Sequence, residues 1–255
     1  MDQQHLAAQQ FGHSAAQYLH SQVHAQGEDL ARLSRLSAEQ RPGRVLDLGC
    51  GAGHASFALA QGDAREIHSY DLAPEMLAVV AAEAQRRGLS QIQTRQGPAE
   101  ALPYADASFD LIVTRYSAHH WADVEQALRE CARVLRPDGR LVVIDVTAPA
   151  QPLLDTALQT LELLRDASHV RNYRQAEWQA MLVRAGFVTA EQDCWKISLQ
   201  FDSWVARIAT PAPRIAALRE VMAALSREAS DYYAIEPDGS FRIDTSWITA
   251  VRHPT

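Results

Sequence analysis

The sequence predicts an α/β fold in which a mostly parallel sheet carries helices on both faces. Short apolar runs alternate with segments of helical spacing between residues 44 and 146, and a glycine-rich turn follows the first run. Two later strand-like segments lack this alternation. Repeated strand–helix units place their strands side by side and parallel. The chain of 255 residues, 47% of them hydrophobic, can bury one substantial core, so we expect a single domain over 1–255.

The N-terminal part of the chain is expected to form a helical flap. Residues 1–43 have weak helical spacing, which Pro42 and Gly43 interrupt. The apolar run at residues 44–48 then predicts a buried strand, which leads into a glycine-rich turn at residues 49–53 and a helix.

A second strand–helix unit follows. The strand is expected at residues 66–70, directly before Asp71. Pro74 suits the first position of a helix, apolar residues keep helical spacing, and Gly88 suits the helix end. A short strand is expected at residues 92–95.

Two further strands complete the expected cofactor-binding core, residues 44–148. They lie at residues 109–114 and 141–146. Between them, Asp123 and Gln126 have the spacing of a helix-capping box, and apolar residues then line one side of a helix.

Residues 149–255 are expected to contain helical insertions and C-terminal strands. The pattern is mainly helical up to residue 186. Expected strands at residues 187–201 and 241–251 flank a helix at residues 213–227. We expect the two strands to complete the sheet as an antiparallel pair.

Charge and targeting features favour a small-molecule partner in the cytoplasm. The net charge of −7, with Lys196 as the one lysine, argues against electrostatic binding of nucleic acid. The N-terminus lacks the basic and apolar regions of a secretory signal, and no apolar run approaches the roughly 20 residues that span a bilayer. Apolar late helices pack either internally or on a second subunit, so oligomeric state is left open.

No metal is expected. The cysteines are odd in number and widely spaced, which suits neither a disulfide framework nor a zinc site, and the N-terminal histidines lack metal-ligand spacing. These residues are Cys50, Cys131, Cys194, His5, His13, His20 and His24.

The glycine-rich turn and two carboxylates predict a nucleoside site. Glycines allow backbone to approach a ligand, and the following helix offers free N–H groups. Asp47 would repel a pyrophosphate but attract an ammonium group, although it could instead cap the loop. Asp71 ends the second strand, where a carboxylate can accept ribose hydroxyls, a feature that dehydrogenases share.

Three segments resemble the class I S-adenosylmethionine-dependent methyltransferases, and in particular the type 11 domain of ubiquinone and menaquinone biosynthesis enzymes. Residues 45–53, VLDLGCGAG, are similar to motif I of that class. Residues 100–110 and 133–141 resemble the later type 11 segments, in the same order. The resemblance implies a Rossmann-like sheet of seven strands, mostly parallel, with helices on both faces and an antiparallel C-terminal pair.

The resemblance also implies which residues bind S-adenosylmethionine. The glycines would contact the methionyl and ribose parts, Asp71 the ribose, and four further residues the adenine, while the flap and the strand-four turn complete the site. The implied residues are Tyr18, Asp47, Gly49, Gly51, Gly53, Asp71, Leu72, Met76, Ala99, Glu100 and Arg115. Many members carry Asp where this chain has Pro98, so one backbone N–H is missing there.

The turn after the fourth strand holds the candidate general bases. His119 and His120 follow that strand at the carboxyl edge of the sheet, where open α/β sheets bind ligands. Either imidazole could accept a proton near neutral pH, or merely hydrogen-bond the turn and pack against Trp121. Asp145 is a weaker candidate because a strand-end carboxylate can cap a loop.

A polar segment inside the C-terminal part supplies candidate acceptor contacts. We expect His169, Arg171 and Tyr173, with Trp121, to contact the acceptor, and Arg171 suits a carboxylate, phosphate or phenolate. Solvated helix ends are the alternative. Trp204 suits core packing better than acceptor recognition.

The expected function is methyl transfer from S-adenosylmethionine to a small molecule. The quinone-biosynthesis resemblance favours an aromatic or quinone-like acceptor. A sulfonium methyl is already activated, so the protein chiefly aligns the nucleophile and excludes water. Two alternatives stay open: a non-catalytic protein that binds S-adenosylmethionine as a sensor or partner module, and an NAD-dependent oxidoreductase.

Overall fold

The structure is a computed structural model, and it describes residues 2–12 and 27–253. Its strands are β1 (Arg44–Leu48), β2 (Glu66–Asp71), β3 (Ile92–Gln96), β4 (Phe109–Arg115), β5 (Leu135–Ala148), β6 (Tyr173–Arg174), β7 (Phe187–Leu199) and β8 (Phe241–Arg252). Its helices are α1 (Gln3–Gly12), α4 (Glu28–Gln40), α5 (His54–Gln61), α6 (Pro74–Arg87), η1 (Ala118–His120), α7 (Val124–Val134), α8 (Pro152–Arg165), α9 (Gln175–Arg184), α10 (Phe201–Ala206), α11 (Ala212–Ala224) and α12 (Arg227–Tyr232). Within these residues, no helix is both long and apolar enough to cross a bilayer.

Seven strands form one sheet in the order β3-β2-β1-β4-β5-β8-β7. The pairs from β3 to β5 are parallel, whereas β8 runs antiparallel to both β5 and β7. The predicted Rossmann-like fold, including its antiparallel C-terminal strands, is therefore confirmed.

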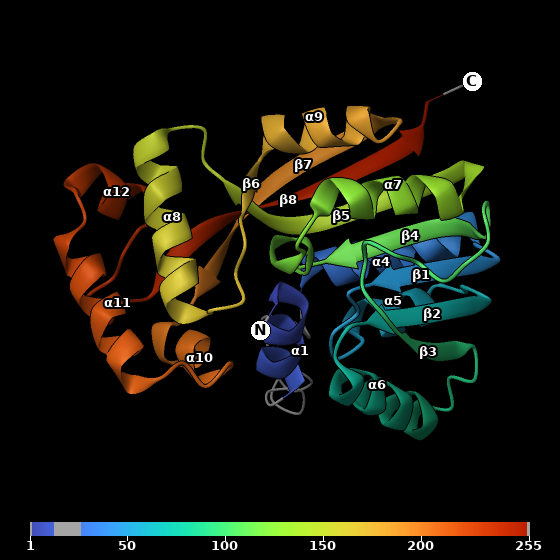
Figure 1. Cartoon of the computed structure of the whole chain (residues 1–255), viewed down its shortest axis with the longest axis horizontal. Coiled ribbons are helices and arrows are strands. Elements are labelled where there is room, and N and C mark those ends of the chain that lie inside the picture. The colour runs from blue at the N-terminus through green and yellow to red at the C-terminus, as the bar shows by residue number, and fades with distance from the viewer. Residues whose placement is uncertain (1, 13–26, 254–255) are drawn as a thin grey trace.

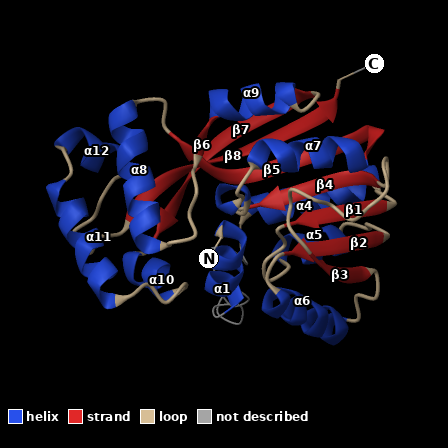
Figure 2. Cartoon of the chain, in the orientation of Figure 1, coloured by secondary structure: helices blue, strands red, loops and turns tan. Residues whose placement is uncertain are grey.

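Helices cover both faces of the sheet (Figure 2). Because successive strand residues point to opposite faces, residues on both sides of a strand become buried. Val45 of β1 packs in a cluster with side chains of α4 and α5. The adjacent Leu46 packs in a second cluster with side chains of α7 and α9. Continuous burial of β1 therefore reflects helices on both sides, as the apolar run predicts.

A separate apolar cluster lies at one end of the long strands, where α8, α10, α11 and α12 gather (Figure 1). Trp204 and Phe241 pack edge to face there, with ring centroids 4.9 Å apart. α1 lies between this helical group and the sheet in Figure 1. α1 therefore lies beside both parts of the fold.

The structure extends two of the sequence predictions. β5 begins at Leu135, six residues before the predicted strand, because Leu135 pairs with Phe109 across a register shift. The two-residue strand β6 was not predicted, and it pairs with the end of β5. The expected capping box at α7 is half formed. Asp123 accepts a hydrogen bond from the backbone N–H of Gln126 at 2.9 Å, but its own backbone N–H donates to Glu100 at 3.2 Å and not to the Gln126 side chain.

Candidate active site

The glycine-rich turn connects β1 to α5 through backbone that favours glycine. Gly49 has φ +71°, and a Cβ there would lie 1.8 Å from Oγ of Ser117 in the turn after β4. Gly51 has φ +51°, but a Cβ there would meet no atom within 4 Å. Gly49 thus permits the two strand-end turns to approach, whereas Gly51 leaves its backbone beside open space.

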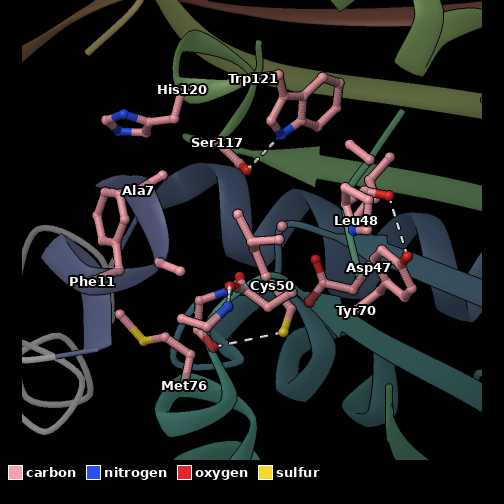
Figure 3. A pocket seen from close by; sticks show the side chains of 18 of the residues that line it. Ala7, Phe11, Asp47, Leu48, Cys50, Tyr70, Met76, Ser117, His120 and Trp121 are labelled. Carbon is pink, nitrogen blue, oxygen red and sulfur yellow. Dashed lines mark hydrogen bonds between the residues drawn. The ribbon is translucent and has the colours of Figure 1, made fainter. Parts of the chain in front are cut away.

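A cavity of about 130 Å³ opens beside this turn, at the carboxyl edge of the parallel strands (Figure 3). We call it the glycine-turn cavity. Its lining includes most of the predicted cofactor residues together with residues of the turn after β4 and part of α1. The predicted residues that line it are Asp47, Gly49, Gly51, Asp71, Leu72, Met76, Ala99, Glu100, Arg115, His120 and Trp121.

One predicted cofactor residue, Gly53, does not line the cavity. It caps α5, and a Cβ there would press against Val80 and Phe57 at 2.9 and 3.1 Å, so it serves packing beside the cavity. Another, Tyr18, lies outside the described residues. From α1, Phe11 lines the cavity (Figure 3).

Asp47 presents an unsatisfied acceptor within the glycine-turn cavity. Its carboxylate is buried, and one oxygen, Oδ2, accepts a hydrogen bond from Ser56 Oγ at 2.6 Å. The other oxygen, Oδ1, is buried, and no described residue forms a hydrogen bond with it. Burial raises the pKa of Asp47 to about 6, although the Ser56 hydrogen bond opposes this shift. A cationic donor would complete this carboxylate.

Asp71 accepts backbone hydrogen bonds beside the glycine-rich turn and can still accept hydrogen bonds from a ligand. Its Oδ2 accepts the backbone N–H of Gly51 at 2.8 Å, and its Oδ1 accepts that of Ala73 at 2.9 Å. Each carboxylate oxygen has a further lone pair for a ligand hydroxyl. Burial raises the pKa of Asp71, against the opposing effect of these backbone hydrogen bonds.

Glu100 and Arg115 connect the cavity to the surrounding helices. Glu100 accepts the backbone N–H of Ala122 at 2.9 Å and the side-chain amide of Gln4 on α1 at 3.3 Å. Arg115, at the end of β4, donates from Nε to Asp29 of α4 at 2.5 Å, and both side chains are buried. These contacts fix α1 and α4 around the cavity mouth.

A second cavity of about 70 Å³ lies beside the first, between the sheet end and the C-terminal helices. We call it the α8 cavity. Phe11, Tyr116 and His120 line both cavities, so the two meet there. Tyr116 has φ +51°, a strained conformation for a non-glycine residue that is typical of functional sites.

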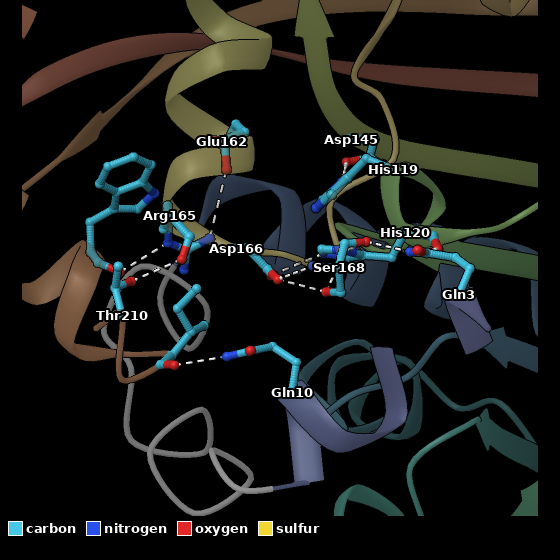
Figure 4. A network of polar contacts seen from close by, with 12 residues as sticks. Gln3, Gln10, His119, His120, Asp145, Glu162, Arg165, Asp166, Ser168 and Thr210 are labelled. Carbon is cyan, nitrogen blue, oxygen red and sulfur yellow. Dashed lines mark hydrogen bonds and ion pairs between the residues drawn. The ribbon is translucent and has the colours of Figure 1, made fainter. Parts of the chain in front are cut away.

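His119 lines the α8 cavity and pairs with Asp145 at the end of β5. Its Nδ1 lies 2.5 Å from Asp145 Oδ1 (Figure 4). A proton on Nδ1 leaves Nε2 with the free lone pair. Burial lowers the pKa of His119, but the charge and hydrogen bond of Asp145 outweigh it, so the net pKa is raised. The arrangement is that of an oriented general base.

His120 is held differently. Its Nδ1 lies 3.2 Å from the backbone oxygen of Ser168, and its ring contacts Phe11 edge to face at 4.8 Å between centroids. Burial and the neighbouring His119 lower the pKa of His120. It therefore suits a neutral wall between the cavities better than a base.

The α8 cavity also contains charged residues that the sequence patterns did not single out. Glu162 and Arg165 lie on the buried face of α8, and Arg207 follows α10. A buried polar pair three residues apart on an otherwise apolar helix face was the available signal. Trp204, which the sequence assigned to packing, lies in the helical core and also lines this cavity.

Three of the predicted acceptor residues line neither of these two cavities. His169 Nε2 lies 2.9 Å from Gln159, and Arg171 pairs with Asp155 and Glu177 at 3.0 and 3.3 Å. Tyr173 packs on Trp178 with ring centroids 5.7 Å apart. These contacts lie within the C-terminal part of the chain, although His169 Nδ1 is buried without a hydrogen-bond partner among the described residues, and its ring centroid lies 5.8 Å from that of His119. A role for the three residues in acceptor binding stays a prediction. Trp121 lines the glycine-turn cavity, and its Nε1 donates to Ser117 at 3.1 Å.

Residues 46–143 match the model of a methyltransferase domain, the segment that carries the glycine turn and the His119 turn. The chain is 40% identical to the uncharacterized methyltransferase YcgJ of Bacillus subtilis, over 88% of each protein. It belongs to the class I methyltransferases. This methyltransferase is also 46% identical to YafE of Escherichia coli K12, over 78% of the chain and 95% of YafE.

The structural comparison agrees with this family. The crystal structure of YcgJ superposes with a TM-score of 0.80 at 36% identity, covering 88% of this methyltransferase and all of YcgJ. A demethylmenaquinone methyltransferase from Thermus thermophilus is 38% identical over 45% of this chain and 52% of its own. That relationship is confined to about half of each protein.

Proposed function

We propose that this methyltransferase binds S-adenosylmethionine in the glycine-turn cavity and transfers its methyl group to a small molecule in the α8 cavity. The observation that carries the proposal is Asp47 Oδ1, a buried acceptor without a partner beside the turn. The ammonium of a methionyl group would satisfy it, whereas a pyrophosphate would be repelled. When bound, S-adenosylmethionine supplies an activated methyl on a sulfonium.

The other lining residues fit the remaining parts of that molecule. Asp71 would accept the ribose hydroxyls with its free lone pairs, while Leu72 and Met76 would flank the adenine. Ala99 and Glu100 would lie at the adenine edge. Because Gly51 leaves open space beside its backbone, the ligand can approach the turn closely.

His119 would act as the general base for an acceptor whose proton must leave. The acceptor oxygen or carbon bonds to the methyl as the sulfur–methyl bond breaks, its electron pair staying on sulfur, and the acceptor proton moves to His119 Nε2. Asp145 would hold the ring and stabilise the resulting imidazolium. Phe11, Tyr116 and His120 would exclude water where the two ligands meet.

An aromatic or quinone-like acceptor fits the walls of the α8 cavity. Tyr116 and Trp204 offer ring surfaces, and Ile197, Leu199 and Ile243 add apolar ones. The partial likeness to a demethylmenaquinone methyltransferase supports the same class. We also propose that the reaction takes place in the cytoplasm.

Calorimetry with the purified full-length protein tests the proposal. We expect S-adenosylmethionine and S-adenosylhomocysteine to bind with micromolar affinity and NAD to bind far more weakly. Release of S-adenosylhomocysteine in the presence of phenolic or quinol acceptors then tests catalysis. Binding of NAD alone would overturn the assignment, and cofactor binding without transfer to any acceptor would favour a sensor or partner module.

A further inference from the structure

The α8 cavity contains a buried guanidinium that the protein does not fully satisfy. Arg165 is 8% exposed and lines the cavity. Its Nε donates to the backbone oxygen of Trp204 at 3.0 Å. Its Nη2 is buried and has no hydrogen-bond partner among residues 2–12 and 27–253. A buried charged donor left without an acceptor is costly, so such a group indicates a ligand that completes it.

The carboxyl group nearest to Arg165 does not satisfy it. Glu162 Oε2 approaches the other terminal nitrogen, Nη1, at 3.7 Å, which is too long for a hydrogen bond (Figure 4). Burial raises the pKa of Glu162 even though the positive charge of Arg165 opposes this shift. The pair therefore leaves part of the guanidinium charge available.

The charges around this position favour an anion. Among the described residues that line the α8 cavity, Arg165 and Arg207 carry guanidinium groups and Glu162 carries the one carboxyl. The two nearby aspartates do not line this cavity. Asp145 pairs with His119, and Asp166 accepts two hydrogen bonds from Ser168 at Oδ1, at 2.7 and 2.8 Å. Asp166 Oδ2 lies 4.0 Å from His120 Nε2 and has no hydrogen-bond partner among the described residues. His120 is neutral at physiological pH because its pKa is lowered.

Apart from Tyr116, His119 and His120, the other described residues that line the cavity are apolar or aromatic, and this limits the group to which the anion can be attached. They include Val146, Ile197, Leu199, Trp204 and Ile243. The cavity is small, at about 70 Å³. A planar carboxylate suits a guanidinium better there than a phosphate, whose second charge would face Glu162.

We infer that the acceptor is an organic acid with an apolar or aromatic body, and that Arg165 binds its carboxylate in the α8 cavity. This inference rests on the proposed function and adds the acceptor class. Arg207 adds positive charge on the same cavity wall. The acid group would anchor one end of the acceptor, and the atom to be methylated would lie toward His119, where the cavities meet.

Matched ligands that differ only in charge test the inference on the wild-type protein. Calorimetry with S-adenosylhomocysteine present would compare phenylpropionate with phenylpropionamide, and octanoate with octanamide and octylamine. We expect each acid to bind about tenfold or more tightly than its amide, and the amine to bind most weakly. If neither acid binds more tightly than its amide, or if the amine binds best, the inference is wrong.

Two substitutions assign the preference to Arg165. Arg165→Gln should reduce the acid-to-amide ratio to about one, whereas Arg165→Lys should keep part of it because the charge remains. The matched control Glu162→Gln removes the neighbouring carboxyl and should keep or increase the ratio. An unchanged ratio in Arg165→Gln would contradict the assignment.

S-adenosylhomocysteine binding separates this inference from the proposed function. We expect it to be unchanged in Arg165→Gln, because Arg165 does not line the glycine-turn cavity. Normal binding also shows that the variant is folded. If S-adenosylhomocysteine does not bind even to the wild type, the proposed function fails. If it binds but no acid preference is found, only the acceptor class fails.

Discussion

The two cavities that meet at Phe11, Tyr116 and His120 are built from different kinds of segment. The glycine-turn cavity is lined mainly by turns at the carboxyl ends of parallel strands, each a short contiguous stretch of sequence. Besides Phe11 and the turn after β4, the α8 cavity is lined by one or two residues from each of β5, β7, β8, α8 and α10. A few local sequence motifs therefore determine the glycine-turn cavity. The ligand preference of the α8 cavity, in contrast, can change through single substitutions on separate elements.

The largest effect is expected at the α8 cavity, from the loss of the proposed base. His119→Gln should lower the rate of methyl transfer by about 10²–10⁴-fold for an acceptor that must lose a proton. The measurement is S-adenosylhomocysteine release at saturating cofactor. The matched control is His68→Gln, a buried histidine of β2 that lines neither cavity and should affect the rate far less. An equal loss in both variants would mean that His119 acts through structure alone.

The glycine-turn cavity should respond most to Asp47. Asp47→Asn removes the charge that would face the ammonium, so S-adenosylhomocysteine should bind about 100-fold more weakly, or roughly 3 kcal/mol. Calorimetry measures this change, and acceptor-side binding should be less affected. Asp63→Asn is the control, because Asp63 is exposed and asparagine tolerates its φ of +73°. Unchanged affinity in Asp47→Asn would remove the main support for the cofactor assignment.

Alanine substitutions at Gly49 and Gly51 should separate the effect of packing on stability from the effect of ligand binding. Gly49→Ala adds a clash with Ser117 to its backbone strain, so we expect the larger loss of folding stability, about 3 kcal/mol or more. Gly51→Ala carries strain alone, about 1–2 kcal/mol, but its Cβ occupies the open space beside the turn and should weaken cofactor binding. Denaturant unfolding and calorimetry separate the two effects. Equal stability losses would contradict the predicted clash.

The smallest effect is expected from pH. The pKa of Asp47 is about 6, so its carboxylate is ionised above that pH and protonated below it. Binding of the S-adenosylhomocysteine ammonium should therefore tighten as pH rises through about 6, with up to about a tenfold loss per unit below it. Calorimetry between about pH 5 and pH 8 measures this dependence. The same profile should flatten in Asp47→Asn, and a wild-type slope that persists in that variant would point to another group.

The sequence predicted the parallel core because each strand there is a short apolar run between recognisable turns. Its errors were local. The start of β5 was missed because Pro137, Asp138 and Gly139 are turn-forming residues, yet Leu135 still pairs with Phe109 ahead of them. α10 and α12, with six residues each, are too short to show helical spacing.

The candidate site divides in the same way. Asp47, Gly49 and Asp71 could be chosen from sequence because each lies at a strand end in a contiguous motif. Arg165 could not be predicted from sequence as a site residue, because its burial depends on contacts with Trp204 and the distant strands. Conversely, Arg171 and His169 were predicted to contact the acceptor because they are polar, whereas in the structure they contact Asp155 and Gln159 within the C-terminal part of the chain.

The shared wall of Phe11, Tyr116 and His120 has a thermodynamic consequence. Any shift of these side chains when one ligand binds changes the surface that the other ligand contacts. Linkage then requires the coupling to be reciprocal, so the factor by which an acceptor alters cofactor affinity must equal the factor by which the cofactor alters acceptor affinity. In the proposed reaction, S-adenosylhomocysteine would occupy the same cavity as S-adenosylmethionine and would have its own coupling factor with the acceptor. The difference between the two factors would set how strongly turnover favours release of the methylated acceptor.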